Sequence, residues 1–212
     1  MGGGGSIPGI LIVGVVLANK GELEMVSDQF VLKWILFLIF STGIVLFSWK
    51  SFRNTRSHGF YRFFAFEAIL ALFLLNMEFW FRQPFSLRQI LSWLLLFMSL
   101  FLAIHGFMLL RRIGKPDPNI QDQKRLNFEK TTQLVRVGAY RYIRHPLYAS
   151  LLCLTWGVFL KHPSLLGAGM GAIATLALYA TSRAEEAENL EHFGTAYAEY
   201  LQQTKMFIPY IF

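Results

Sequence analysis

Long apolar stretches constrain the fold of this chain most strongly. Three of them, Phe30–Trp49, Phe60–Phe81 and Gln89–Leu110, each have about 20 residues, the length that a helix needs to cross the hydrocarbon core of a bilayer. Two shorter stretches, Leu147–Leu160 and Ser164–Thr181, follow as a helical hairpin. The sequence therefore predicts an all-α polytopic membrane protein with about five transmembrane helices.

The charged residues are few and unevenly placed. Only 16% of the 212 residues are charged, against roughly 25% in soluble domains. Four Lys/Arg lie between Lys50 and Arg62, and nine lie between Arg111 and Arg144. The positive-inside rule therefore places the first and third connections and the C-terminus in the cytoplasm and the N-terminus outside. The membrane topology accounts for the basic net charge, so we expect no nucleic-acid partner.

The domain organisation follows from the apolar stretches. We expect residues 1–29 to form a linker-like N-terminus with a short apolar segment at the outer face, Ile7–Ala18, and residues 30–212 to form one domain. The last helix is expected to continue to Gly194, a residue type that often ends helices. A short amphipathic helix, Thr195–Gln203, is predicted to follow on the cytoplasmic side. We assign three glutamates of this region to solvent, Glu188, Glu191 and Glu199, and two tyrosines to packing, Tyr197 and Tyr200.

Two charged clusters stand at the ends of the hairpin. The run Arg144-His145-Pro146-Leu147-Tyr148 opens the fourth apolar stretch, and the pair Glu185-Glu186 follows the fifth. Charges are costly at a membrane boundary, so they indicate function. Proline favours the first position of a helix, which places His145 beside a helix N-terminus, where anions bind. Because the hairpin makes the two helices neighbours, we expect the clusters to face each other on the cytoplasmic side.

Opposite charges in one place suit a ligand that carries both a carboxylate and a cationic centre. S-adenosylmethionine (SAM) has this charge pattern, although charge alone does not distinguish it from other zwitterions. Aromatic faces are expected nearby from Tyr140, Tyr142, Tyr148 and Tyr179. Cys153 is the one cysteine and lies in an apolar stretch, so we predict neither an internal disulfide nor a metal site.

The C-terminal third carries more specific motifs. Gly138-Ala139-Tyr140-Arg141 leads into the His-Pro run, and the acidic pair precedes Phe193-Gly194-Thr195-Ala196-Tyr197-Ala198-Glu199-Tyr200 and Ile208-Pro209. With these motifs, Val135–Phe212 resembles the isoprenylcysteine carboxyl methyltransferase family and, more distantly, the phospholipid N-methyltransferases. The resemblance implies SAM-dependent methyl transfer to a lipid-like or membrane-partitioned acceptor, with residues 135–212 as the catalytic part.

The resemblance also implies residue roles. The implied cofactor-binding residues are Gly138, Tyr140, His145, Pro146, Tyr148, Glu185 and Glu186. Those of the His-Pro run would line the methionine end of SAM, and the two before it would close the pocket. The acidic pair would contact the cofactor or position the acceptor. The expected catalytic residues are Arg144 and Glu186, the latter as the base if the acceptor must lose a proton.

Two ionisable residues lie inside the apolar stretches themselves. Glu67 and His105 are each about 10 Å from the cytoplasmic ends of their spans at 1.5 Å per residue. Groups at such depths either bond to each other between helices or line a channel for a substrate. Both alternatives stay open, and we name the two residues as candidates for a substrate channel.

Two other functions are compatible with parts of the sequence. NAD(P)H-dependent membrane reductases of the sterol-reductase type share the Arg-His-Pro run but usually continue with Asn, where this chain has Leu147. A transporter or scaffold without enzymatic activity would favour inverted repeats or a broken mid-membrane helix, and the sequence has neither. The acceptor group (carboxylate, amine or thiol) and the oligomeric state stay open.

Overall fold

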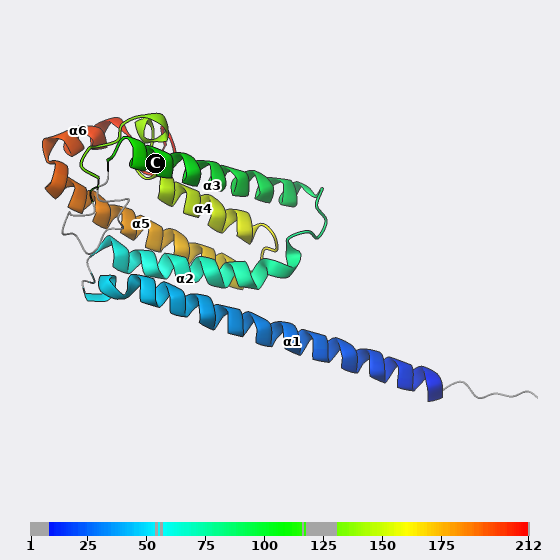
Figure 1. The fold of residues 1–212 in the computed structure, drawn as a ribbon. Coiled ribbons are helices and arrows are strands. Elements are labelled where there is room, and N and C mark those ends of the chain that lie inside the picture. Colours follow the sequence, from blue (N-terminus) through cyan, green and yellow to red (C-terminus); the bar gives the residue numbers. More distant parts are fainter. Residues whose placement is uncertain (1–8, 54, 56, 116, 118–130, 212) are drawn as a thin grey trace, which may run out of the picture. The chain divides into compact units, whose positions relative to one another are not determined.

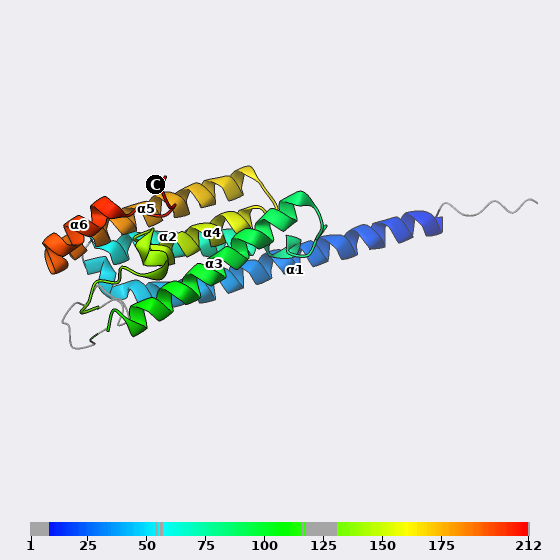
Figure 2. The ribbon, with the colours of Figure 1, turned by 90° about the horizontal axis from the view of Figure 1, so that it is seen from above.

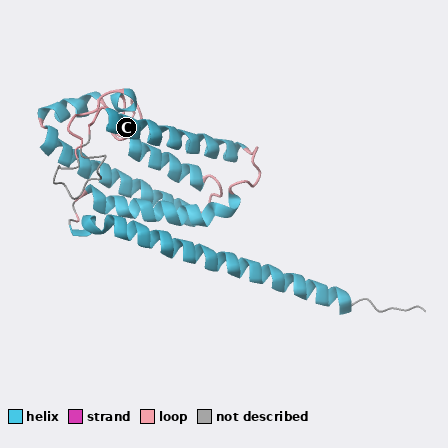
Figure 3. Ribbon diagram, in the orientation of Figure 1, coloured by secondary structure: helices cyan, strands magenta, loops and turns pink. Residues whose placement is uncertain are grey.

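The computed structural model describes residues 9–53, 55, 57–115, 117 and 131–211. Every regular element in these residues is a helix (Figure 3), which confirms the predicted all-α class. The first element, α1 (Gly9–Ser48), runs without a break through most of the predicted outer segment Ile7–Ala18 and the first predicted span. The linker-like start at residues 1–6 lies outside the described residues.

The chain divides into two compact units, Met1–Phe40 and Ser41–Phe212. The four main helices and the candidate site described below belong to the second unit. Its four main helices lie alongside one another in both views (Figures 1 and 2), and the most extensive contacts join α2 to α5 and α3 to α4. These helices are α2 (His58–Asn76), α3 (Leu87–Arg112), α4 (Pro146–Phe159) and α5 (Leu165–Phe193).

Local sequence signals set the helix ends. Ser86 caps α3 by accepting a hydrogen bond from the Gln89 N–H at 3.4 Å, Ser164 caps α5 in the same way, and both are preferred N-cap residues. Gly194, with a φ of +58°, ends α5. The short elements are the 3-10 helices η1 (Trp49–Arg53), η2 (Met77–Phe79) and η3 (Gly138–Arg141), and the helix α6 (Thr195–Gln203).

Among the residues that the structure describes, four helical segments are long and apolar enough to cross a membrane: Ser27–Ser48, His58–Phe79, Leu87–Arg112 and Leu165–Phe193. The remaining main helix, α4, is apolar but has 14 residues. At 1.5 Å per residue it is about 21 Å long, shorter than the hydrocarbon core of about 30 Å. A fifth crossing by α4, the amphipathic role of α6 and the orientation of the termini therefore stay predictions.

The segment after α6 folds back onto the residues that precede α4. Ile143 and Lys205 form an isolated parallel bridge, and the His145 N–H donates to the Met206 carbonyl at 3.2 Å. Met206 and Phe207 are buried in the hydrophobic core. The end of the chain therefore holds the start of α4 in place.

A buried lysine marks the opposite end of the bundle. Lys161, in the turn between α4 and α5, is fully buried. Its Nζ lies 3.6 Å from the centre of the Trp93 ring and donates to Oε1 of Gln89 at 3.1 Å. Burial lowers the pKa of Lys161 to about 8. Sequence reasoning placed this residue in the hairpin turn but did not predict its burial.

Candidate functional site

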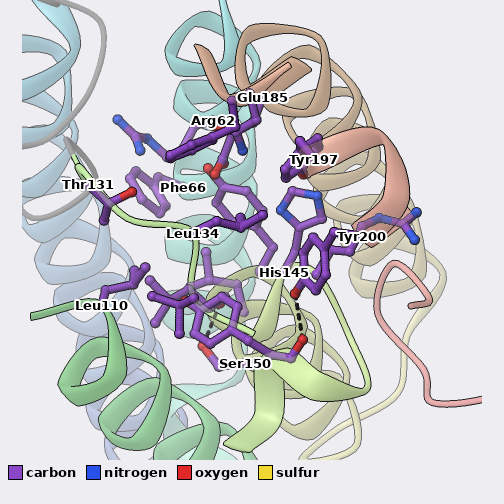
Figure 4. A pocket seen from close by; sticks show the side chains of 18 residues that line it. Arg62, Phe66, Leu110, Thr131, Leu134, His145, Ser150, Glu185, Tyr197 and Tyr200 are labelled. Carbon is purple, nitrogen blue, oxygen red and sulfur yellow. Dashed lines mark hydrogen bonds between the residues drawn. The ribbon is translucent and has the colours of Figure 1, made fainter. Parts of the chain in front are cut away.

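A cavity of about 250 Å³ lies at the end of the bundle where α2 and α4 begin and α3 and α5 end. Figure 4 shows that side chains from several helices point toward it. Its polar lining includes Arg62, Arg144, His145, Ser150, Glu185 and Asn189, and its apolar lining includes Phe66, Leu110, Leu134, Leu147 and Leu151. The cavity thus combines groups of both charges with an apolar wall.

The two charged clusters meet beside this cavity. Oε1 of Glu186 accepts a hydrogen bond from Nε of Arg144 at 2.6 Å and lies 3.3 Å from Nε2 of His145. Its Oε2 accepts from Arg183 at 3.1 Å. Glu186 is 3% exposed, and a buried carboxylate needs such partners because its desolvation is costly. The meeting of the clusters, predicted from the short hairpin, is confirmed.

The two neighbouring glutamates take different positions. Glu185 lines the cavity, whereas Glu186 does not line it and instead holds Arg144 and His145, which do. The Arg144 guanidinium also donates to the backbone carbonyls of Leu201, at 3.4 Å, and Thr204. The catalytic roles of Arg144 and Glu186 stay predictions.

Four buried tyrosines line the cavity: Tyr140, Tyr148, Tyr197 and Tyr200. The Tyr200 hydroxyl donates to the Tyr140 carbonyl at 2.6 Å (Figure 4). Burial raises the pKa of Tyr197 and of Tyr200 above the usual range, so both phenols stay neutral. Sequence reasoning assigned these two tyrosines of α6 to packing. The available signal was their three-residue spacing, which puts them on one helix face.

Gly138 shapes the turn that leads to the cavity without lining it. Its φ of +60° is a left-handed conformation that favours glycine, and a Cβ there would lie 2.6 Å from Nε2 of His105. The Ala139 N–H donates to the same nitrogen at 3.4 Å. η3 therefore packs against α3 and brings Tyr140 to the cavity. Pro146, also a predicted site residue, occupies the first position of α4 and is not part of the lining.

The two ionisable residues of the spans have separate partners. Ser41 donates to Oε1 of Glu67 at 2.9 Å, whereas His105 contacts Ala139 and stacks on Phe101, with ring centres 5.5 Å apart. Neither residue lines the cavity. The structure does not pair them with each other, and their place along a substrate channel stays a prediction.

α2 contributes a wall that sequence reasoning missed. Arg62 and Phe66 line the cavity, and at the start of α2 the Nδ1 of His58 lies 2.7 Å from Oε2 of Glu188. The prediction that Glu188 faces solvent is wrong, because this residue joins α5 to α2. The available signal was the four-residue spacing of His58, Arg62 and Phe66, which puts them on one helix face.

A second hollow lies along α4 and shares no lining residue with the first. It has about 860 Å³, is almost wholly apolar, and its lining includes Cys153 and Tyr179. Tyr142 is exposed and lies near Tyr210. The expectation that Tyr142 and Tyr179 belong to the charged site is therefore wrong. In the part of the chain that the structure describes, no group of three or more His, Cys, Asp or Glu side chains is arranged to hold a metal ion.

A helical bundle with membrane-length helices and a charged cavity at one end is the architecture of an integral membrane protein with a candidate binding site. A family model described as phospholipid methyltransferase (PEMT) matches residues 87–196, which are 110 of the 212 residues. The chain belongs to this family of membrane methyltransferases. No significant match to the chain was found among curated proteins or solved structures.

Proposed function

We propose that this protein is a SAM-dependent methyltransferase that acts on a lipid-like or membrane-partitioned acceptor. The observation that carries the proposal is the cavity in which His145, at the start of α4, and Glu185, on α5, share one lining. Membership of a membrane methyltransferase family restricts the reaction to methyl transfer, and the family description favours a phospholipid. An isoprenylcysteine-like carboxylate is the alternative acceptor.

The residues of the cavity fit the charges of SAM. His145 and Arg144 stand beside the N-terminus of α4, where a carboxylate is favoured by the helix dipole. Glu185 offers the opposite charge to an ammonium group. The rings of Tyr148 and Tyr197, both buried, present faces that attract a cation. Gly138 and Pro146 act through the backbone turns that position these side chains.

When bound, SAM supplies an electrophilic methyl group on a positively charged sulfur. The protein aligns the acceptor with the methyl group and excludes water from the cavity. The four buried tyrosines of the lining serve the exclusion of water. We assign Arg144 and Glu186 a structural role in the site, because Nε of Arg144 lies 2.6 Å from Oε1 of Glu186.

An amine or thiol acceptor must lose a proton, whereas a carboxylate acceptor need not. Glu185 is the carboxylate that lines the cavity, so we place the base there rather than at Glu186, whose oxygens already accept from Arg144 and Arg183. Tyr197 and Tyr200 remain protonated because burial raises the pKa of each phenol. Neither supplies a phenolate base.

Localisation follows from the same proposal. Nine Lys/Arg lie between Arg111 and Arg144, directly before the site, and the positive-inside rule assigns such a connection to the cytoplasm. We therefore place the cavity at the cytoplasmic face, with the C-terminus inside and the N-terminus outside. The acceptor then reaches the apolar wall, which includes Leu110 and Leu134, from the bilayer.

Titration of the purified protein with SAM and with NADPH tests this proposal. We expect wild-type protein to bind SAM and not NADPH, and His145→Ala and Glu185→Ala each to weaken SAM binding at least about tenfold, the effect of losing one charge-assisted contact. Glu199→Ala, which removes an exposed carboxylate of α6, is the matched control. Circular dichroism checks that all variants keep their helices. Binding of NADPH without SAM, or unchanged methyl transfer in both site variants, would overturn the proposal.

A further inference from the structure

The apolar hollow of about 860 Å³ lies on the face of α4 that is turned away from the charged cavity. Its residues on α4 follow one another at spacings of three and four, which puts them on one face of the helix: Ala149, Leu152, Cys153 and Trp156. At about 100° per residue this face points away from Leu147 and Leu151, which line the cavity. The helix α4 therefore separates a charged cavity from an apolar hollow that the proposed reaction does not use.

The walls of the hollow come from α3 and α5. The helix α4 contacts both of them and lies between them in both views (Figures 1 and 2). Leu95 and Leu102 mark the extent of the hollow along α3, a rise of about 10 Å. Both wall helices are long and apolar enough to cross a membrane, so a hollow near their middles adjoins the hydrocarbon core. One leaflet contributes about 15 Å to that core, so a single acyl chain can line the hollow.

Polar and basic side chains begin where the hollow ends. Ile143 and Phe207 line that end. Just beyond them, Tyr142 and Tyr210 are exposed, with ring centres 6.2 Å apart, and tyrosines are enriched at the headgroup level of membranes. Lys205 is exposed and forms its backbone bridge with Ile143. A positive charge therefore stands at the headgroup level, directly beside an apolar hollow.

An anionic membrane lipid matches both features. Its acyl chain suits the apolar lining, since large exposed apolar surfaces mark sites of membrane contact. Its phosphate suits Lys205 and the exposed Arg141, which lies two residues before Ile143, because basic residues at a membrane surface attract anionic lipids. We placed this end of the bundle at the cytoplasmic face, and the cytoplasmic leaflet is the one that carries anionic lipids.

The segment that closes the hollow also holds the cavity. The ring centre of Phe207 lies 6.2 Å from that of His145. The Arg144 N–H donates to the Lys205 carbonyl at 2.8 Å, and the His145 N–H donates to the Met206 carbonyl at 3.2 Å. A chain packed against Phe207 and a headgroup at Lys205 would both stabilise the segment on which the position of His145 depends.

We propose that the hollow binds an acyl chain of an anionic membrane lipid that is not the methyl acceptor, with the lipid phosphate beside Lys205. We further assign this lipid a regulatory effect: it strengthens cofactor binding by holding Phe207 against His145. The lipid site stands on the hollow and on the charge beside it, whereas the effect on SAM rests on the proposed methyltransferase function.

The fluorescence of Trp156 tests the lipid site, because this side chain lines the hollow and is 37% exposed. The full-length protein is reconstituted in phosphatidylcholine vesicles that contain increasing fractions of a lipid with brominated acyl chains, which quench tryptophan on contact. The brominated lipid is either phosphatidylcholine or phosphatidylglycerol. Phosphatidylglycerol is anionic and has no amine, thiol or carboxylate that could accept a methyl group. Subtracting the signal of Trp156→Phe isolates the contribution of Trp156.

Three variants complete the quenching experiment. Lys205→Gln removes the charge beside the hollow. Lys115→Gln is its matched control, an exposed lysine that follows α3 at the same end of the bundle. Cys153→Phe places a ring in the hollow, and circular dichroism checks that each variant keeps its helices.

We expect brominated phosphatidylglycerol to reach half-maximal quenching of Trp156 at about a fivefold lower fraction than brominated phosphatidylcholine, the effect of one lysine at an anionic surface. Lys205→Gln should abolish this preference, Lys115→Gln should keep it, and Cys153→Phe should reduce quenching by both lipids. Equal quenching by the two lipids in wild-type protein, or a preference that survives in Lys205→Gln, overturns the inference. So does the absence of quenching by either lipid, which would mean that protein covers the hollow.

Titration with SAM tests the regulatory effect. Wild-type protein should bind SAM about fivefold more tightly in vesicles that contain unbrominated phosphatidylglycerol than in pure phosphatidylcholine, the lower end of usual couplings between sites. The difference should disappear in Lys205→Gln and persist in Lys115→Gln. An affinity for SAM that does not depend on the anionic lipid overturns the regulatory effect. Absence of SAM binding in both kinds of vesicle would instead refute the proposed function, and the quenching experiment would still decide the lipid site.

Discussion

At the scale of single residues, two adjacent glutamates have different surroundings. Glu186 is 3% exposed and meets Arg144, His145 and Arg183, whereas Glu185 is half-buried and lines the cavity. Adjacent residues of a helix project about 100° apart, so one helix turn serves both the interior and the cavity. The first carboxylate therefore supports the site, and the second is available to a ligand.

Because of this difference, replacement by glutamine is expected to affect stability at one position and SAM binding at the other. Glu186→Gln leaves Arg144, whose side chain is 11% exposed, without its counter-charge and should destabilise the protein by about 3 kcal/mol, a fall in Tm of roughly 6–12 °C. Glu185→Gln should leave Tm within about 2 °C but weaken SAM binding. Thermal unfolding in detergent and SAM titration of both variants check this. Equal losses of Tm in the two variants would contradict the assignment.

At the scale of elements, the site depends on short segments that bind to the main helices. η3 rests on His105 of α3, α6 reaches back through the Tyr200 hydroxyl to the Tyr140 carbonyl, and the chain end pairs with Ile143. These contacts join residues that are far apart in the sequence. The cavity lining from η3 and α6 therefore depends on packing that no single element determines.

Gly138 is the position where this dependence is tested most directly. Gly138→Ala adds a Cβ that would lie 2.6 Å from Nε2 of His105, at a φ of +60°. The substitution should lower the free energy of unfolding by about 1–3 kcal/mol. It should also weaken SAM binding, because it displaces Tyr140. Gly169→Ala is the control, because a Cβ at this position of α5 meets nothing within 4 Å; it should stabilise by up to about 1 kcal/mol. Tm and SAM affinity are measured for both. A Gly138→Ala variant as stable as wild-type protein would show that η3 tolerates a side chain.

At the scale of the whole bundle, the two ends hold buried charge in different ways. At the cavity end, Arg144 and Glu186 form an ion pair at 2.6 Å. At the other end, the ammonium of Lys161 has the amide oxygen of Gln89 and the ring of Trp93 as partners. Neutral partners compensate desolvation less than a counter-charge does, which is why burial lowers the pKa of Lys161 to about 8.

Lys161 gives the bundle a predicted pH dependence. In the unfolded chain the lysine keeps its proton up to its ordinary pKa of 10.5, whereas in the folded protein it releases it near 8. Between these pH values the unfolded state binds more protons than the folded state, so the free energy of unfolding rises with pH. One pKa unit corresponds to roughly 1.4 kcal/mol. The total rise is therefore at most about 3 kcal/mol.

Thermal unfolding from pH 7 to 10.5 checks this prediction. The Tm of wild-type protein should rise across the upper part of this range relative to that of Lys161→Met, whereas Lys205→Met, at an exposed lysine, should follow wild-type protein. Parallel curves for wild-type protein and Lys161→Met would show that the buried lysine does not titrate in this window.

Apolar length and local signals were sufficient to predict the helices after the first one, whereas α1 begins at Gly9 and not at the predicted Phe30. α3 and α4 start within two residues of the predicted spans, and α6 coincides with the predicted Thr195–Gln203. The meeting of His145 with Glu186 was also predictable, because a short hairpin forces its two helices together. These features depend on neighbouring residues, so the sequence alone determined them.

Only the tertiary structure decided which distant side chains share a surface. Arg62 and Tyr200 join the cavity from α2 and α6, Glu188 meets His58 rather than solvent, and Lys161 is enclosed at the opposite end. Helical periodicity specifies which residues share a face of one helix. It does not specify which other helix that face meets, because this depends on the packing of all the helices together.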